Sequence, residues 1–175
     1  MAVEKRILTD AMQTFRIEAE SLAETAKVLE PEAFGLAVEA LAGAPRIAAA
    51  GCGHTGIACR HFAHLMCCIE RPARFLSPAE AVHGGMGFLQ PGDVMLLASR
   101  GGKTDELMPI ADICRKKGVT VIAVTENLSS PLAEKADIVL AMKVTRECDP
   151  YNCQGTTSFA VTCAIFDALQ VAVLE

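Results

Sequence analysis

Residues 94–104 read VMLLASRGGKT, and this stretch decides the fold. The first five positions form a continuous apolar run, and the polar loop that follows contains Gly101 and Gly102. An apolar run without in–out alternation is typical of a strand that is buried on both faces of a parallel sheet. A glycine-rich turn directly after such a strand is typical of a connection to a helix. The stretch therefore predicts one strand–loop–helix unit of an α/β domain.

The same pattern recurs on both sides of this unit. Further apolar runs predict strands at 46–50, 73–76, 119–125 and 138–142. Helical periodicity or turn signals predict helices at 1–29, 32–42, 55–69, 79–83, 104–117, 130–136 and 156–174, with Thr104 as the N-cap of the fifth. Because strands and helices alternate, we expect a parallel sheet with helices on both faces.

The two ends of the chain differ in character. Residues 1–43 predict a helical segment that packs on the α/β domain of residues 44–175 or on a partner subunit. The last helix, 156–174, is apolar on nearly every side, which indicates that it is buried. A subunit interface is the simplest explanation of that burial, so we expect an oligomer.

Composition excludes several classes of protein. The chain has 175 residues, of which 51% are hydrophobic, and a net charge of −5 from 16 Lys+Arg and 21 Asp+Glu. The apolar fraction supports a core and excludes a disordered chain. The lack of a basic surplus argues against nucleic acid or an anionic membrane surface as a partner. With eight cysteines but no C-x-x-C pair, and no signal-peptide pattern, we expect a cytoplasmic protein with reduced thiols.

Residues 51–56, GCGHTG, form the first of two glycine loops at strand ends. They match the dinucleotide fingerprint G-x-G-x-x-G. That fingerprint needs an acidic residue at the end of the next strand to bind the ribose. The next strand ends here at residues 76–78, LSP, without an acid. A nicotinamide cofactor is therefore disfavoured, and no cofactor is expected.

The second loop, Ser99–Thr104, contains Gly-Lys-Thr but is not a nucleoside-triphosphate P-loop. The P-loop pattern requires a glycine at the position of Leu97, which lies inside the strand. The remaining interpretation is a phosphate nest made by the amides of 101–104, the hydroxyls of Ser99 and Thr104, and a helix dipole. Two such loops at the ends of parallel strands predict an anionic small molecule at the carboxyl edge of the sheet.

Residues 77–87, SPAEAVHGGMG, carry the most specific part of a resemblance to the sugar isomerase (SIS) domain family. The matching stretches continue, in order, with PGDV at 91–94, the loop 99–104, Glu106, KVTRE at 143–147 and TTS at 156–158. Within that family the sequence is most similar to arabinose-5-phosphate isomerases. The resemblance implies a three-layer α-β-α sandwich with a five-stranded parallel sheet of flavodoxin-like topology. It also implies isomerisation of a phosphosugar between aldose and ketose through a cis-enediol, by a homodimer or homotetramer.

The resemblance also implies roles for individual residues. It places the active-site glutamates at Glu106 and Glu147 and an active-site histidine at His83. Substrate and phosphate ligands fall on Gly53, Thr55, Ser99, Arg100, Gly101, Gly102, Lys103, Thr104, Thr156 and Thr157. Isomerisation needs a base to move a proton between two carbons and a donor to polarise the carbonyl. We expect Glu147 or Glu106 as the base and His83 or His54 as the electrophile or ring-opening group.

The sequence departs from the family pattern at several positions. His54 stands where the family has a lysine, and Gly101 stands where the phosphate loop has a second serine. The family's tail with a His-Pro-Gly-Gly element and its CBS modules are not within these 175 residues. Alternative interpretations are a non-catalytic module that binds a phosphosugar or nucleotide sugar, and a 6-phospho-3-hexuloisomerase-like enzyme. No metal is expected; the less favoured alternative is that His54 and His83 converge with Glu147 or Cys148 on a metal ion.

Overall fold

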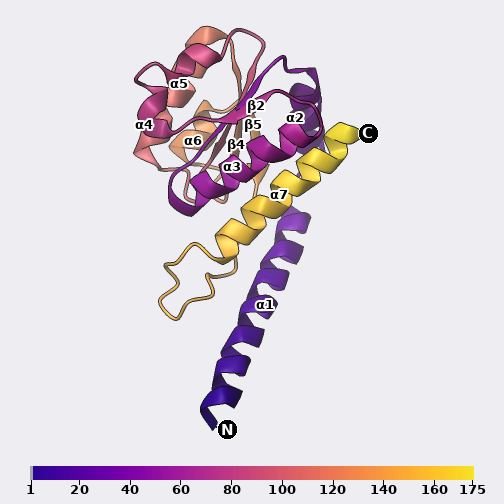
Figure 1. Ribbon diagram of the computed structural model, residues 1–175, viewed down its shortest axis with the longest axis vertical. Helices are drawn as coiled ribbons and strands as arrows, with labels where there is room; N and C mark the ends of the chain where they lie inside the picture. Colours follow the sequence, from indigo (N-terminus) through magenta and orange to yellow (C-terminus); the bar gives the residue numbers. More distant parts are fainter. Residues whose placement is uncertain (1) are drawn as a thin grey trace.

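Five parallel strands form the sheet at the centre of the molecule, in the order β2-β1-β3-β4-β5 (Figure 1). The computed structural model describes residues 2–175, with side chains from Arg6 onward. The strands are β1 (Ile47–Ala50), β2 (Ala73–Phe75), β3 (Val94–Ala98), β4 (Thr120–Thr125) and β5 (Ile138–Ala141). The strand order reverses between β1 and β3, which is where the ligand of an open α/β sheet is expected to bind.

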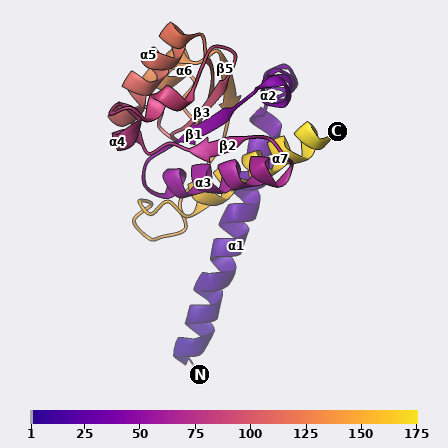
Figure 2. The ribbon, with the colours of Figure 1, turned by 45° about the horizontal axis from the view of Figure 1, so that its top comes forward.

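Helices cover both faces of the sheet. The α-helices are α1 (Ala2–Val28), α2 (Pro31–Gly43), α3 (Gly53–Cys68), α4 (Pro78–Ala81), α5 (Met108–Lys117), α6 (Pro131–Lys135) and α7 (Thr157–Leu174). Two 3-10 turns, η1 (Gly85–Phe88) and η2 (Asp105–Leu107), precede β3 and α5. Figure 2 shows α4, α5 and α6 on one side of the sheet and α3 and α7 on the other.

Successive residues of each strand point into different cores, as an apolar run buried on both faces requires. Ala49, Leu96 and Val124 belong to the cluster shared with α2, α3 and α7. Leu97 and Ala123 belong to the opposite cluster, shared with α5 and α6. The predicted three-layer sandwich with a five-stranded parallel sheet is therefore confirmed.

The prediction of a helix over 104–117 with Thr104 as its N-cap is correct only in part, because Thr104 holds the N-cap position of a 3-10 turn and not of the α-helix itself. Residues 105–107 form the 3-10 turn η2, and α5 begins only at Met108, with Pro109 in its first turn. The Thr104 side chain makes no capping hydrogen bond, because its hydroxyl lies 2.8 Å from the Ser99 hydroxyl instead. A proline near the start of a helix is well tolerated, since the first amides of a helix have no partner within it.

The apolar helix α7 buries one side within this chain and leaves Val171 and Leu174 exposed. It packs against α3, α2 and α1, and Val161, Phe166 and Leu169 are buried in the core. A subunit interface is therefore not needed to explain the burial of these residues. By length and composition α7 is the one described helix that could cross a bilayer. Core helices of water-soluble domains share that composition, and α7 occupies one layer of the sandwich.

The second half of α1 is attached to the domain, whereas its first half extends away from it (Figures 1 and 2). The Ser21 hydroxyl lies 2.9 Å from the Thr145 hydroxyl, and the Thr25 hydroxyl donates to the Lys143 carbonyl at 2.9 Å. The extended half exposes large apolar side chains, namely Ile7, Leu8, Met12 and Phe15. A cluster of this kind on an isolated helix is typical of a surface that a partner covers.

We propose that a second copy of the chain covers this apolar stripe, which would give the expected homo-oligomer. Phe15 is 66% exposed, and Phe15→Glu places a charge in the middle of the stripe. We expect this substitution to lower the molecular mass in solution, measured by light scattering after size-exclusion chromatography. Gln13→Glu adds the same charge at an exposed polar position of the same helix and serves as the control. An unchanged mass for both variants would contradict the proposal.

Candidate active site

The predicted site residues lie mainly at one edge of the sheet, where β1, β3 and β5 end. The loop after β1 carries Gly51–Gly56, the loop after β3 carries Ser99–Thr104, and residues 142–156 connect β5 to α7. The carboxyl ends of parallel strands meet at one edge of a sheet, so the fold brings these three loops together.

Glycines allow the first loop to pack directly against the start of α3. A Cβ at Gly56 would lie 2.6 Å from the Gly51 carbonyl oxygen, closer than real contacts allow. Gly53 has a φ of +56°, in the left-handed region that favours glycine. The glycines of this fingerprint thus allow close packing between the loop and the helix.

A pocket of about 400 Å³ opens beside this loop. It brings together the loop itself, the start of α4 and the turn η2, through Gly51, Cys52, Gly53, Gly56, Ile57, Arg60, Phe75, Ser77, Pro78, Ala79 and Glu106. Two predicted site residues from different loops, Gly53 and Glu106, therefore line the same cavity. Burial, together with the negative charge of Glu106, raises the pKa of the Cys52 thiol, so Cys52 is a poor nucleophile there.

The second loop folds back on its own side chains. The Gly102 amide donates to the Ser99 hydroxyl at 3.1 Å, and the Ser99 and Thr104 hydroxyls lie 2.8 Å apart. Gly102 has a φ of +63°, and a Cβ there would lie 2.0 Å from the Ser130 hydroxyl oxygen. Gly101 has open space around it, and Lys103 is exposed. The loop therefore presents Gly101 and Lys103 outward, while Ser99 and Gly102 hold its shape.

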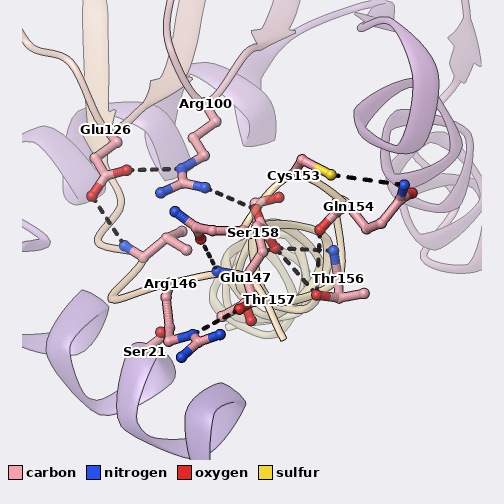
Figure 3. Close-up of polar contacts among 12 residues, drawn as sticks. Ser21, Arg100, Glu126, Arg146, Glu147, Cys153, Gln154, Thr156, Thr157 and Ser158 are labelled. Carbon is pink, nitrogen blue, oxygen red and sulfur yellow. Dashed lines mark hydrogen bonds and ion pairs between the residues drawn. The ribbon is translucent and has the colours of Figure 1, made fainter. Parts of the chain in front are cut away.

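Arg100, which the sequence places among the phosphate ligands, points toward two carboxylates (Figure 3). Its Nε donates to Glu126 at 2.9 Å, and its Nη1 donates to Glu147 at 2.8 Å. Glu126 also accepts from the Val144 amide at 3.2 Å and lies 3.4 Å from the Lys143 ammonium group. Burial raises the pKa of Glu126, but these hydrogen bonds outweigh it and hold the pKa below its ordinary value.

Glu147 is buried against the N-terminus of α7, with a side chain that is 4% exposed. Its Oε2 accepts from the amides of Thr156 and Ser158, at 3.0 and 3.1 Å, and from the Thr156 hydroxyl at 3.3 Å. Its own amide donates to the Asn152 side chain at 2.7 Å. The helix N-terminus and Arg100 thus compensate a carboxylate that would otherwise be costly to bury.

The other predicted residues occupy different surroundings. His54 is exposed in the first turn of α3, against Phe159 of α7 with the rings 6.5 Å apart and edge-on, and His83 is exposed in the turn after α4. Neither histidine lines the 400 Å³ pocket, and neither does Glu147. Thr55 is half-buried at the start of α3, and the Thr157 hydroxyl lies 3.2 Å from the Cys148 sulfur. The monomer therefore groups the predicted residues into the Glu106 pocket and the Glu147 network.

Among the side chains of residues 6–175, no group of three or more His, Cys, Asp or Glu could hold a metal ion. The alternative in which His54 and His83 converge on a metal with Glu147 or Cys148 therefore has no support in this geometry. Cys148 instead contacts Thr157, and His54 contacts Phe159.

Comparison with known proteins places this arrangement in a family. The model of the SIS domain family matches residues 40–172, which is more than half of the chain. The chain belongs to the SIS domain family. The match covers all five strands and the loops that follow them.

Curated relatives of this chain include arabinose 5-phosphate isomerases. KdsD of Pseudomonas aeruginosa is 37% identical over 135 residues, which are 77% of this chain and 41% of KdsD. KpsF of Escherichia coli is 31% identical over 174 residues, which are 99% of this chain and 55% of KpsF. The SIS domain described here thus spans about half the length of these relatives.

Solved structures match over nearly the whole chain. A Listeria monocytogenes protein that is provisionally described as a sugar-phosphate isomerase superposes with a TM-score of 0.93 at 41% identity, covering 97% of this chain and 90% of that chain. An E. coli CFT073 protein, solved in complex with arabinose 5-phosphate, superposes with a TM-score of 0.90 at 25% identity, covering 98% of this chain and 91% of its own. The SIS fold is thus shared along the whole chain and not only over its central sheet.

Sequence reasoning missed several residues of the site. Glu126, Asn152 and Ser158 hold Arg100 or Glu147, and Cys52 and Arg60 line the pocket. Glu126 could have been found, because it directly follows β4 at the same edge of the sheet. Ser158 lies in the matching stretch 156–158, but its bond to Glu147, like that of Asn152, depends on how the β5–α7 connection folds.

The second loop predicts a contrast between its two glycines. Gly102→Ala places a Cβ against Ser130 and keeps a left-handed φ, so we expect the free energy of unfolding to fall by about 3 kcal/mol. Gly101→Ala, in open space, should change it by less than about 0.5 kcal/mol. Denaturant titration measures both, and equal losses would contradict the loop geometry.

The lowered pKa of Glu126 predicts a pH dependence of stability. The ordinary pKa of 4.5 applies in the unfolded chain and a lower pKa in the folded protein. The contribution of this carboxylate is therefore complete above pH 4.5 and is lost as the pH falls through the folded value. We expect the unfolding free energies of the unchanged chain and the Glu126→Gln variant to converge in that acidic range. A difference that stays constant with pH in denaturant titrations would refute this.

Proposed function

We propose that this SIS domain isomerises a phosphosugar between aldose and ketose, with arabinose 5-phosphate or a similar sugar as substrate. The observations that carry the proposal are that the glycine loop after β3 bonds Glu147 through Arg100, and that Glu106 lines a pocket beside the loop after β1. The identity to arabinose 5-phosphate isomerases and the superposition on a structure in complex with arabinose 5-phosphate support the same class of substrate.

In this proposal the loop Ser99–Thr104 holds the phosphate. Gly101 and Lys103 are both exposed, which suits an anion arriving from solvent. Lys103 supplies a cation in a loop where Gly101 has replaced a hydroxyl. The sugar then extends from the loop toward the Glu106 pocket, whose volume of about 400 Å³ accommodates a small ligand.

The proposed base is Glu147. Transfer of a proton between C1 and C2 through a cis-enediol requires one carboxylate that accepts the proton from one carbon and returns it to the other. Oε2 of Glu147 already accepts three hydrogen bonds, whereas Oε1 accepts one, from Arg100, and has a lone pair left for the proton. Glu106 lines the pocket and is suited to a sugar hydroxyl, and His54 or His83 would polarise the carbonyl or open the ring.

Proton exchange tests this proposal directly. The purified chain is incubated in D₂O with arabinose 5-phosphate, ribulose 5-phosphate and hexulose 6-phosphates, and NMR follows deuterium at C1 and C2. Glu147→Gln should lower kcat by about 1,000-fold while binding of inorganic phosphate persists, because only the base is removed. Glu134→Gln, the same change at an exposed position on α6, is the control and should leave turnover intact.

Two departures favour a second candidate, a module that binds a phosphosugar without converting it. These are His54 in place of a lysine and Gly101 in place of a serine. A thermal-shift screen with the same phosphosugars separates the candidates, since a bound ligand stabilises the folded state whether or not it reacts. Stabilisation without any proton exchange would replace the isomerase proposal with the binding module.

A further inference from the structure

Both the main-chain carbonyl and the side chain of Arg100 are hydrogen-bonded within the protein, although the residue lies in the predicted phosphate loop. Its carbonyl accepts from the Glu126 amide at 2.9 Å and from the Thr125 hydroxyl at 3.0 Å. Its guanidinium bridges the carboxylates of Glu126 and Glu147 (Figure 3). Main-chain and side-chain contacts together fix the direction in which this side chain points.

The two cations of the loop are in opposite situations. Arg100 is 34% exposed and bonded to two carboxylates. Lys103 is exposed and takes part in none of the ion pairs found among the side chains of residues 6–175. A phosphate that arrives at the loop therefore meets an ammonium group without an ion-pair partner among these residues and a guanidinium that is already bonded to two carboxylates.

Withdrawing Arg100 from its partners would be costly. Glu147 is 4% exposed, and a buried carboxylate that loses its cation is strongly destabilised. Glu126 would keep only Lys143 as a cation, at 3.4 Å. The planar guanidinium can address both carboxylates at once from its Nε and Nη1, whereas a lysine ammonium group is a single point charge.

Arg100 bonds to Oε1 of Glu147, which is the oxygen that would accept the proton in the proposed reaction. Oε2 is occupied by the N-terminus of α7, so Arg100 is the one described donor to Oε1. A donor at that oxygen fixes the rotation of the carboxyl group and the direction of its remaining lone pair. A small error in that direction lowers the rate of proton transfer, because the reacting atoms must be aligned.

We propose that Arg100 is a positioning residue that aligns Oε1 of Glu147, and that Lys103 is the cation that binds the substrate phosphate. This inference rests on the proposed function, because it assumes that Glu147 is the base. The sequence alone assigns phosphate binding to both residues. This inference leaves phosphate binding to Lys103 and gives Arg100 the alignment of Glu147. It also gives Glu126 a role, as the second anchor of the guanidinium.

Four variants test the division of roles: Arg100→Lys, Arg100→Ala, Lys103→Gln and, as a matched control, Arg115→Lys at an exposed position of α5. We expect Arg100→Lys to lower kcat by about 100-fold without a measurable change in KM or in the Kd of inorganic phosphate. Lys103→Gln should raise the Kd of inorganic phosphate by about tenfold. Added guanidinium should partly restore kcat in Arg100→Ala, whereas methylammonium at the same concentration should not.

Two readouts need no turnover. Hydrogen exchange of the amides of Thr156 and Ser158 should speed up in Arg100→Lys and stay unchanged in Lys103→Gln and Arg115→Lys, because only Arg100 steadies their carboxylate partner. Phosphate binding, measured by calorimetry, should be intact in Arg100→Lys. A chain without isomerase activity would refute the proposed function, yet these two measurements would still decide whether Arg100 holds Glu147 or binds phosphate.

Several results would overturn the inference. One is a weakened affinity for phosphate in Arg100→Lys with unchanged exchange at Thr156 and Ser158, which would make Arg100 a phosphate ligand. Another is an unchanged kcat in Arg100→Lys. A third is restoration of Arg100→Ala by methylammonium as well as by guanidinium, which would show that charge alone matters and that alignment does not.

Discussion

The buried charge of Glu147 is the constraint on which the arrangement of the site depends. A carboxylate in the interior must be paired and hydrogen-bonded, or the domain loses stability. Its partners come from the loop after β3, through Arg100, and from the start of α7, through Thr156 and Ser158. Satisfying this one side chain therefore fixes two loops relative to each other and sets where α7 begins.

The same requirement explains the form of the β5–α7 connection. Asn152 has a φ of +55° and accepts a hydrogen bond from the Glu147 amide. The carboxylate of Asp149 accepts from the amides of Tyr151, Cys153 and Gln154, which keeps the connection folded on itself. These hydrogen bonds, above all the one from the Gln154 amide, hold the pKa of Asp149 below its ordinary value. The segment is thus a shaped support for Glu147 and not merely a link between a strand and a helix.

The two glycine loops have similar compositions, but their glycines have different structural roles. In the first, Gly51 and Gly56 let α3 pack against its own loop and leave a pocket beside it. In the second, Gly102 lets the chain approach Ser130 while Gly101 and Lys103 face solvent. In the proposed function, the second loop binds the phosphate and the pocket beside the first loop takes the sugar.

The sequence by itself determined the architecture. Apolar runs, helical periodicity and glycine turns depend on residues close together in the chain, so the strands, the helices and the two loops could be predicted. It also marked Glu106 and Glu147 through family resemblance. The start of α5 was misjudged because residues 105–107 form a 3-10 turn and the Thr104 hydroxyl bonds to Ser99. Only the tertiary structure decided the partners of Arg100, which lie 26 and 47 residues away at Glu126 and Glu147. No local pattern encodes a pairing over that separation, since it arises when strands distant in sequence end at a common edge.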